Sequence, residues 1–217
     1  MIKSRKVRTK RDGDTETRIL DAAHRVFVRS GTAGARTQEI AKEAGVNSAL
    51  LHYYFRTKER LAEAVFRRAA GQLMPAVIRI LASDIPLDEK VAQVVEVELR
   101  QLSATPYLPG YVLSELNHHP ERSAQLFSSA TGIRPEQVRA IVVGTLSRQI
   151  DERVRDGRMH PIAPEQFVVN LLALCIFPFA ARPMVTTLLG LDQAGFSKFI
   201  DRRREELAPF FLRALRV

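Results

Sequence analysis

The chain has 217 residues, of which 46% are hydrophobic and 26% charged, a balance typical of a globular protein with one large or two modest domains. No apolar run follows the basic N-terminus, which argues against a secretory signal. The most apolar stretch, residues 168–181, is shorter than the roughly 20 residues that a membrane-spanning helix needs. A single cysteine, Cys175, excludes an internal disulfide and fits a reducing compartment. We therefore expect a cytoplasmic protein that does not engage a membrane.

Charge is distributed unevenly along the chain. Residues 1–58 hold 13 Lys and Arg against 6 Asp and Glu, a net charge of +7, whereas the whole chain carries +9 and residues 59–217 contribute only +2. A protein that binds phosphates needs such a basic segment. Within it, residues 1–13 carry six Lys and Arg without apolar periodicity and are expected to be disordered alone. They either enter a DNA minor groove as a flexible arm or only keep the protein soluble.

Apolar spacing and capping residues predict three helices before residue 58. An amphipathic helix is expected over Thr15–Ser30, with Gly31 ending it. Two short helices follow, with Thr37 as the expected N-cap of the first and Gly45 as its left-handed C-terminal residue. Asn47 is the expected N-cap of the second. Two short helices joined by a Gly-containing turn form a helix-turn-helix.

The remainder of the chain also predicts helices, and no strand-like alternation is visible. A long helix is expected from Lys58, capped by Thr57, to Pro75 or a little beyond. The further predicted helices are 87–103, 111–117, 121–129, 135–156, 165–177 and 196–215. Helix 165–177 is apolar around most of its circumference and therefore needs covering on every side. The prolines at 178 and 183 are expected to bend or break the chain there.

No constellation of residues indicates catalysis or metal binding. His118 and His119, with Glu115 or His160, invite a metal site, but adjacent histidines in a Pro-terminated turn point apart and no zinc-like spacing is present. An exposed turn or a pocket rim is the simpler interpretation. There is no nucleophile elbow and no phosphate-binding Gly-rich loop. We expect no metal, no cofactor and no enzymatic activity.

The helix-turn-helix segment resembles the DNA-binding signature of the TetR family of bacterial transcription regulators. The resemblance rests on Thr37, Ile40, Ala41, Ala44, Gly45, Val46, Leu51, Tyr54, Phe55, Lys58, Glu59 and Leu61. With the preceding helix it covers about the first quarter of the chain, and the remainder is similar only in length and helical texture. Two positions depart from the family pattern. Ala49 stands where the family often has Gly, and His52 stands where it often has a Tyr that touches phosphate.

The resemblance implies an all-α protein with a three-helix DNA-binding domain over residues 1–58 and a helical effector-binding and dimerisation domain over residues 59–217. Such a protein is a transcription repressor that a small, mostly apolar effector releases from double-stranded operator DNA. The homodimer would form through helices in 164–217. The implied contacts to bases or sugars are Asn47, Ser48 and Tyr53; the implied phosphate contacts are Thr37, His52, Tyr54 and Lys58. Leu51 and Phe55 should belong to the core.

Two questions stay open from the sequence. The residues Tyr107, Tyr111, Leu116, Phe127 and Phe179 either line the effector cavity between helices or belong to an ordinary packed core. The resemblance favours the cavity. The function also has two rivals: a DNA-binding protein without a ligand, such as a constitutive repressor or architectural protein, and a small helical enzyme with an incidental helix-turn-helix. A well-formed pocket would argue against the first, and the lack of a catalytic constellation argues against the second.

Overall fold

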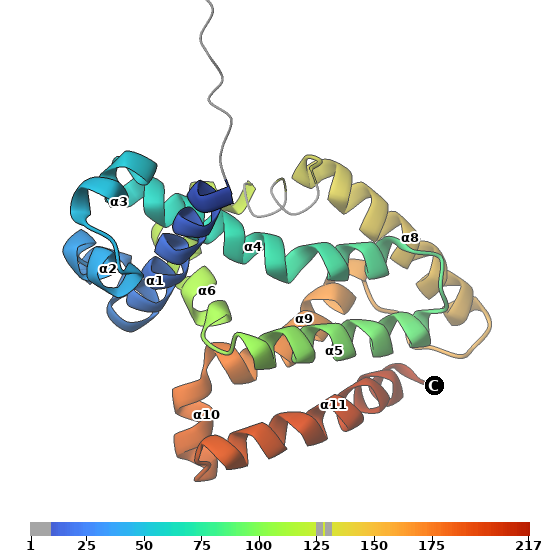
Figure 1. Ribbon diagram of the computed structural model, residues 1–217. Coiled ribbons are helices and arrows are strands. Elements are labelled where there is room, and N and C mark those ends of the chain that lie inside the picture. Colours follow the sequence, from blue (N-terminus) through green and yellow to red (C-terminus); the bar gives the residue numbers. More distant parts are fainter. Residues whose placement is uncertain (1–9, 125–127, 129–131) are drawn as a thin grey trace, which may run out of the picture. The chain divides into compact units, whose positions relative to one another are not determined.

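The computed structural model describes residues 10–124, 128 and 132–217, and every regular element within them is a helix (Figure 1). This confirms the all-α prediction. Contacts divide the chain into two compact units, 1–68 and 69–217, and helix α4 (Lys58–Ala82) contributes residues to both. The proposed N-terminal arm lies largely outside the described residues. Residues 10–13, which were expected to be disordered, are instead the start of the first helix.

The first unit consists of α1 (Lys10–Gly34), α2 (Thr37–Ala44), α3 (Ser48–Phe55) and the first turns of α4. Gly31 leaves the helical conformation with φ 67° and ψ 161°, so the regular part of α1 ends where the sequence predicts. Apolar side chains from all four helices are buried together. They are Ile19, Ala23, Val26, Phe27, Ile40, Ala41, Leu51, Phe55, Leu61, Val65 and Phe66.

The second unit contains the rest of α4 and a series of further helices. They are α5 (Leu87–Ala104), α6 (Leu108–His118), a 3-10 turn (Pro120–Arg122), α8 (Pro135–Arg155), α9 (Pro164–Ala180), α10 (Arg182–Leu189) and α11 (Gln193–Leu215). Helices α5 and α11 lie side by side, and α9 packs against α5 (Figure 1). Fully buried side chains such as Val91, Leu99, Phe167 and Leu171 fill the interior between them. Of the expected helix 121–129, residues 125–127 and 129 lie outside the described residues, and its first two residues belong to the 3-10 turn.

Prolines open two helices at the predicted places, and the predicted bend lies between Pro178 and Pro183. Pro135 and Pro164 occupy the first helical position of α8 and α9, where a missing N–H costs nothing. The predicted end of the helix at Phe177 is wrong, because α9 continues through Pro178 to Ala180. The chain bends by 75° between α9 and α10, and Pro183 lies in the first turn of α10.

The physical reason is visible in a contact from α11. Pro178 cannot donate to the carbonyl four residues earlier, which belongs to Leu174. Arg203 donates to that carbonyl instead, from Nε at 3.1 Å and from Nη2 at 2.8 Å. The substitute hydrogen bonds let α9 tolerate the proline and tie α9 to α11.

Within the described residues, no single helix has the length and apolarity needed to cross a bilayer; α9 and α10 reach the threshold only as a pair, across their bend.

Three charged side chains, those of Lys90, Glu98 and Glu115, are buried inside the second unit, and Glu115 pairs with Arg122. Lys90 donates from Nζ to the carbonyls of Leu81 and Ser83, at 2.8 Å each, and so satisfies the C-terminal end of α4. Burial lowers the pKa of Lys90. Burial also raises the pKa of Glu98, from 4.5 to about 7. The Cys175 thiol has its pKa raised to about 12, mainly by burial and also by the charge of Glu98, so it stays protonated at neutral pH.

Glu98 predicts a specific pH dependence of stability. A carboxyl whose pKa is raised on folding destabilises the folded state as pH increases from its unfolded pKa through its folded pKa. The cost is therefore small below pH 4.5 and complete above about pH 7. Its full size is about 3 kcal/mol, since a tenfold change in proton affinity corresponds to about 1.4 kcal/mol. Glu98→Gln should be more stable than the wild type at pH 8 and nearly equal to it at pH 4.5.

Urea unfolding of both proteins between pH 4.5 and pH 8 measures this difference. Glu96→Gln is the matched control, because Glu96 lies on the same helix, has a side chain that is 41% exposed, and has its pKa lowered chiefly by a hydrogen bond from Arg100. The explanation fails if the wild type and Glu98→Gln lose stability in parallel over this pH range.

Candidate nucleic-acid interface

Arg18 of α1 holds the turn of the helix-turn-helix in place. Its Nη2 donates to the carbonyls of Ala44 at 2.9 Å and Gly45 at 3.1 Å, and its Nε donates to Ala44 at 3.3 Å. These carbonyls lie at the C-terminal end of α2, where the helix has no further N–H groups to offer them. Gly45 adopts the left-handed conformation, with φ 64° and ψ 37°, as predicted for the residue that ends α2.

The N-terminus of α3 is capped as the sequence predicts, whereas the N-terminus of α2 is not. Asn47 caps α3, because its Oδ1 accepts a hydrogen bond from the Leu50 N–H at 2.8 Å. The prediction that Thr37 caps α2 is wrong. Arg36 occupies the N-cap with an extended backbone, φ −104° and ψ 134°, and Thr37 is already the first helical residue. A cap hydrogen bond needs the extended conformation, which falls one residue earlier than the side-chain pattern suggests.

Helix α3 has one buried face and one exposed face. Leu51 and Phe55 are 1% and 6% exposed, so the prediction that both belong to the core is confirmed. The opposite face presents Ser48, Ala49, His52, Tyr53 and Arg56, whose spacing repeats every three to four residues. Tyr53 is 65% exposed, with its ring edge-on to Tyr54 at 5.4 Å. The exposed site at Ala49 shows why its departure from the family pattern does not disturb packing.

The other predicted DNA contacts differ in exposure. Asn47 is exposed beside Ser48, and Thr37, Tyr54 and Lys58 are half-buried. Nζ of Lys58 donates to the carbonyls of Ala33 at 3.0 Å and Ala35 at 3.3 Å. This contact was not foreseen from the sequence, because the acceptors lie more than 20 residues away and carry no side-chain signal.

His52 and Arg56 form a second contact that sequence reasoning missed. The His52 Nδ1 lies 3.0 Å from the carbonyl oxygen of Arg56. Arg56 has φ 60°, and within the described part of the chain it is the only non-glycine residue with a positive φ. This conformation is normally adopted by Gly or Asn, so the residue type at position 56 did not predict it.

The acidic residues of α2 pair with arginines of α1. Glu43 accepts from Arg25 at 2.6 Å and from Arg29 at 2.8 Å, and Glu39 accepts from Arg29 at 3.0 Å. Hydrogen bonds from these arginines lower the pKa of Glu43. Between Ala44 and Lys58 the sequence contains no Asp or Glu. The exposed face of α3 therefore carries no carboxylate that would repel a phosphate backbone.

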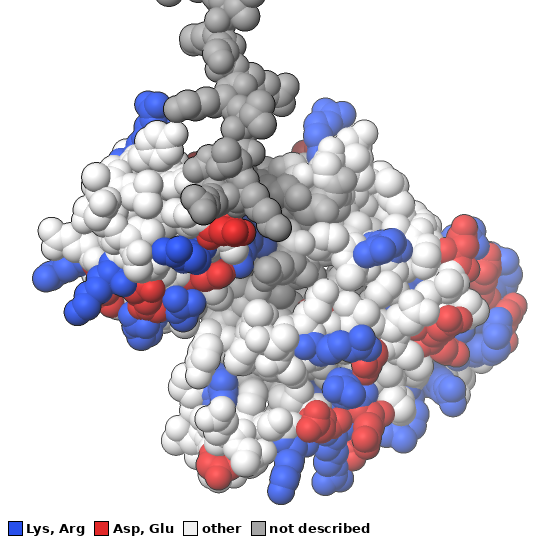
Figure 2. All heavy atoms as spheres, viewed as in Figure 1, with Lys and Arg blue, Asp and Glu red and all other residues white. Residues whose placement is uncertain are grey.

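The second unit has a different electrostatic character. Figure 2 shows Lys and Arg interspersed with Asp and Glu over α11 and the C-terminal end of α8. Exposed pairs one helical turn apart include Arg202 with Glu206 and Arg148 with Glu152. Mixed charges of this kind solvate a surface without attracting a polyanion.

The residues predicted to line an effector pocket occupy different environments. Tyr111 and Phe179 are buried, Leu116 is half-buried and Tyr107 is 59% exposed. Phe127 lies outside the described residues. Of the hollows that the described residues line, one of about 150 Å³ includes Phe179, and its remaining lining was not predicted. The cavity formed by all five residues stays a prediction.

Comparison with known proteins agrees with this geometry. Residues 19–65 match the family of bacterial regulatory proteins called the tetR family. The chain is 31% identical to the HTH-type transcriptional regulator BetI of Rhizobium meliloti, over 58% of this chain and 55% of that protein. It is 28% identical to the HTH-type transcriptional repressor SCO4008 of Streptomyces coelicolor, over 61% of this chain and 69% of that protein. The match thus spans about half of BetI and about two thirds of SCO4008.

The fold is similar to that of solved regulators. The crystal structure of HlyIIR, a hemolysin II transcriptional regulator, superimposes with a TM-score of 0.53 at 23% identity, over 94% of this chain and 98% of that one. Like these structures, the chain has an N-terminal helix-turn-helix followed by a larger helical unit. Residues 19–65 thus match the model of the tetR family of bacterial regulatory proteins, and the chain as a whole is similar in fold to solved transcriptional regulators.

Arg18 provides a test of how the helix-turn-helix is stabilised. Arg18→Met should lower the free energy of unfolding by about 1–3 kcal/mol, because it removes the side-chain donor of the half-buried Ala44 carbonyl at the end of α2. Arg25→Met, which removes an exposed ion pair between the same two helices, should cost less than about 1 kcal/mol. Thermal and urea unfolding measure both values. Equal losses in the two variants would contradict the role assigned to Arg18.

Proposed function

We propose that this regulator is a repressor that binds double-stranded operator DNA through α3 and is released by a small, mostly apolar effector held in the second unit. The observation that carries the DNA-binding part is the exposed, carboxylate-free face of α3, Ser48 to Arg56, on a rigid three-helix support. Repression is supported by the name of the relative SCO4008, a transcriptional repressor. In this proposal residues 1–58 bind DNA, and residues 59–217 bind the effector and form the dimer.

The residues of the interface are assigned separate roles. Ser48 and Tyr53 are exposed on α3 and are proposed to contact bases or sugars. Asn47 can contact a base through its amide NH2 group, since its oxygen already caps the helix. Thr37, Tyr54 and Lys58 flank this surface and are proposed to meet phosphates, which position the protein without reading sequence.

His52 is assigned a different role from the phosphate contact that the family resemblance implies. A carbonyl oxygen only accepts, so the nitrogen facing Arg56, Nδ1, carries the hydrogen. In the neutral ring Nε2 is then an acceptor. Phosphate oxygens also only accept, whereas the amino groups of adenine and cytosine donate in the major groove. We therefore assign His52 to base reading.

Selection of binding sites from a random duplex library tests this function and this assignment together. The wild type should enrich a pseudo-palindromic sequence, with half-sites about one helical turn apart or a multiple of it, because two-fold symmetric dimers impose that spacing. His52→Ala should relax the preference at one base pair of each half-site and leave the slope of log affinity against log salt unchanged. A lost phosphate contact would instead lower the magnitude of the slope by about one.

Lys58→Ala serves as the matched comparison in the same assay. It should weaken binding similarly on all sequences, whether through the phosphate or through the Ala33 and Ala35 carbonyls that it supports. A protein that enriches no sequence would refute the proposed function. A His52→Ala variant with unchanged base preference and a shallower salt slope would return His52 to the phosphate backbone.

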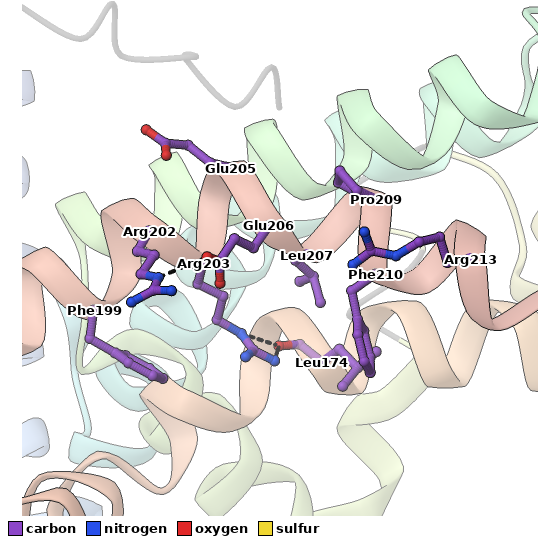
Figure 3. A pocket seen from close by; sticks show the side chains of 10 residues that line it. All are labelled: Leu174, Phe199, Arg202, Arg203, Glu205, Glu206, Leu207, Pro209, Phe210 and Arg213. Carbon is purple, nitrogen blue, oxygen red and sulfur yellow. Dashed lines mark hydrogen bonds and ion pairs between the residues drawn. The ribbon is translucent and has the colours of Figure 1, made fainter.

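The second unit presents an apolar surface suited to a second copy of the chain. Large apolar side chains are exposed on three consecutive helices: Val169 and Phe177 on α9, Met184, Leu188 and Leu189 on α10, and Phe210 on α11. Phe199 and Phe210 of α11 project into one open groove of about 850 Å³, where Arg203 reaches the Leu174 carbonyl (Figure 3). Exposed apolar side chains on three consecutive helices mark an association site, so we propose that the homodimer forms here.

The dimer can be broken without disturbing the core. Leu171 is fully buried, so a charge there would unfold the unit, whereas Phe177 is 52% exposed on the same helix. Phe177→Glu should give a folded monomer and weaken operator binding, because both half-sites are no longer held together. Light scattering at micromolar concentration measures the mass, and far-UV circular dichroism checks the fold. A native protein that is already monomeric would contradict the proposed interface.

Effector control requires that the ligand binds one state of the dimer better than another. Helix α4 is the proposed lever, because it begins at Lys58 in the first unit and continues to Ala82 in the second. A small change in its tilt would alter the separation of the two α3 helices, and fixed half-site spacing would penalise the mismatch. Reciprocity then requires operator DNA to weaken effector binding by the same factor.

A further inference from the structure

Arg182 begins α10, directly after the bend that follows α9. Its guanidinium carbon lies 4.6 Å from the centroid of the Phe196 ring and 5.3 Å from that of the Tyr107 ring. Both distances are within the range of a cation–π contact. The two rings come from α11 and from the start of α6, so three segments distant in sequence meet at this cation.

No carboxylate neutralises Arg182 among the residues that the structure describes. The side chain is only partly exposed. Its aromatic neighbours contact the guanidinium but supply no hydrogen-bond acceptor in the plane of the group, where its N–H donors point. A partly buried guanidinium of this kind is prepared for an anionic partner.

A hollow of about 150 Å³ lies beside this side chain. Phe179, Phe196 and Ile200 form its apolar wall, and Ser103, Gln193 and Ser197 contribute polar groups. No Asp or Glu lines it. The volume is close to that of a cavity that accommodates one benzene molecule. The Ser103 hydroxyl already donates to the Leu99 carbonyl at 2.7 Å, so the donors left for a ligand come from Arg182, Gln193 and Ser197.

We infer that this hollow binds a small organic carboxylate, with Arg182 pairing with the carboxylate group and the apolar wall covering a hydrophobic body about the size of one ring. This inference rests on the proposed effector function and specifies the chemical class of the ligand. A guanidinium matches a carboxylate through two parallel hydrogen bonds, and its aromatic neighbours strengthen the pairing by keeping water away. Inorganic anions lack the hydrophobic body that the wall requires.

The position of the site suggests what the ligand does. The lining residues come from the C-terminal end of α5, from the bend between α9 and α10, and from the first turns of α11. Tyr107, which contacts Arg182, is the residue immediately before α6. A carboxylate on Arg182 fixes these four chain segments to one another and so favours one arrangement of the second unit.

Calorimetric titration of the full-length protein with benzoate tests the site. Benzamide is the matched ligand control, because it has the same shape and no charge. Benzoate should bind saturably, and benzamide should bind at least about tenfold more weakly, because a hydrogen-bonded charge pair is worth more than a neutral contact. Sulfate should compete poorly. No saturation by benzoate up to about 10 mM, equal binding of the two ligands, or competition by sulfate as strong as by benzoate itself would overturn the inference.

Two arginine variants separate the pairing from a general charge effect. Arg182→Gln should reduce benzoate affinity at least about tenfold, and Arg202→Gln, on exposed α11 surface and paired with Glu206, should leave it unchanged. Arg182→Lys keeps the charge but not the two-pronged geometry, so its affinity should fall between those of Arg182→Gln and the wild type. Benzoate binding by folded Arg182→Gln at the wild-type affinity would refute the site; if that variant does not fold, the Lys variant decides.

Duplex binding by the same preparations reports on the proposed function independently. A wild-type protein that selects an operator but does not bind benzoate refutes this site and leaves the regulator intact. A protein that binds benzoate through Arg182 but selects no duplex sequence refutes the proposed function and leaves the site intact.

Discussion

Backbone carbonyls that lack a helical N–H partner are the constraint on which this fold depends. A short helix leaves its last carbonyls unsatisfied, and burial makes each of them costly unless a donor reaches it. This protein meets the requirement repeatedly with long basic side chains from elsewhere in the chain. The donors are Arg18 for Ala44 and Gly45, Lys58 for Ala33 and Ala35, Lys90 for Leu81 and Ser83, and Arg203 for Leu174. Each of these contacts also joins two helices; three of them lie at the end of a helix, and the fourth lies at the interruption that Pro178 makes inside α9.

This use of basic residues changes how the charge of the first unit is understood. Arg18 and Lys58 donate to backbone carbonyls, and Arg25 and Arg29 pair with Glu43. These contacts leave the net charge of residues 1–58 unchanged, because carbonyls are neutral and Glu43 is already counted in it, but they hold four of the basic side chains in contacts within the protein. The stronger indication is local: no carboxylate follows Glu43 until α4 has begun. Glu39 and Glu43 serve the contact between α1 and α2, and Asp21 pairs with Arg68 of α4.

Helix α9 of the second unit is unusually apolar, and only part of its surface is buried in the core of that unit. One side of α9 is buried in the core, with Phe167, Leu171 and Cys175 fully enclosed, while Val169 and Phe177 remain exposed. In the sequence all of these positions are apolar. Hydrophobic character alone does not indicate which of them a neighbouring helix covers. Arg203 fixes α9 against α11, and the bend after α9 brings Arg182 to the aromatic rings of Phe196 and Tyr107. The proposed dimer interface and the proposed ligand site thus both include residues of α9 and α11.

The sequence by itself determined the features that depend on a few neighbouring residues. The all-α class, the left-handed Gly45, the Asn47 cap and the core positions Leu51 and Phe55 follow from local sterics and from the 3.6-residue period. Tertiary structure alone decided the contacts between residues far apart in the chain. Pro178 stays inside a helix because Arg203, 25 residues later, replaces the hydrogen bond that proline cannot make. The cap of α2 shifted to Arg36 because backbone conformation, and not side-chain preference, selects the capping residue.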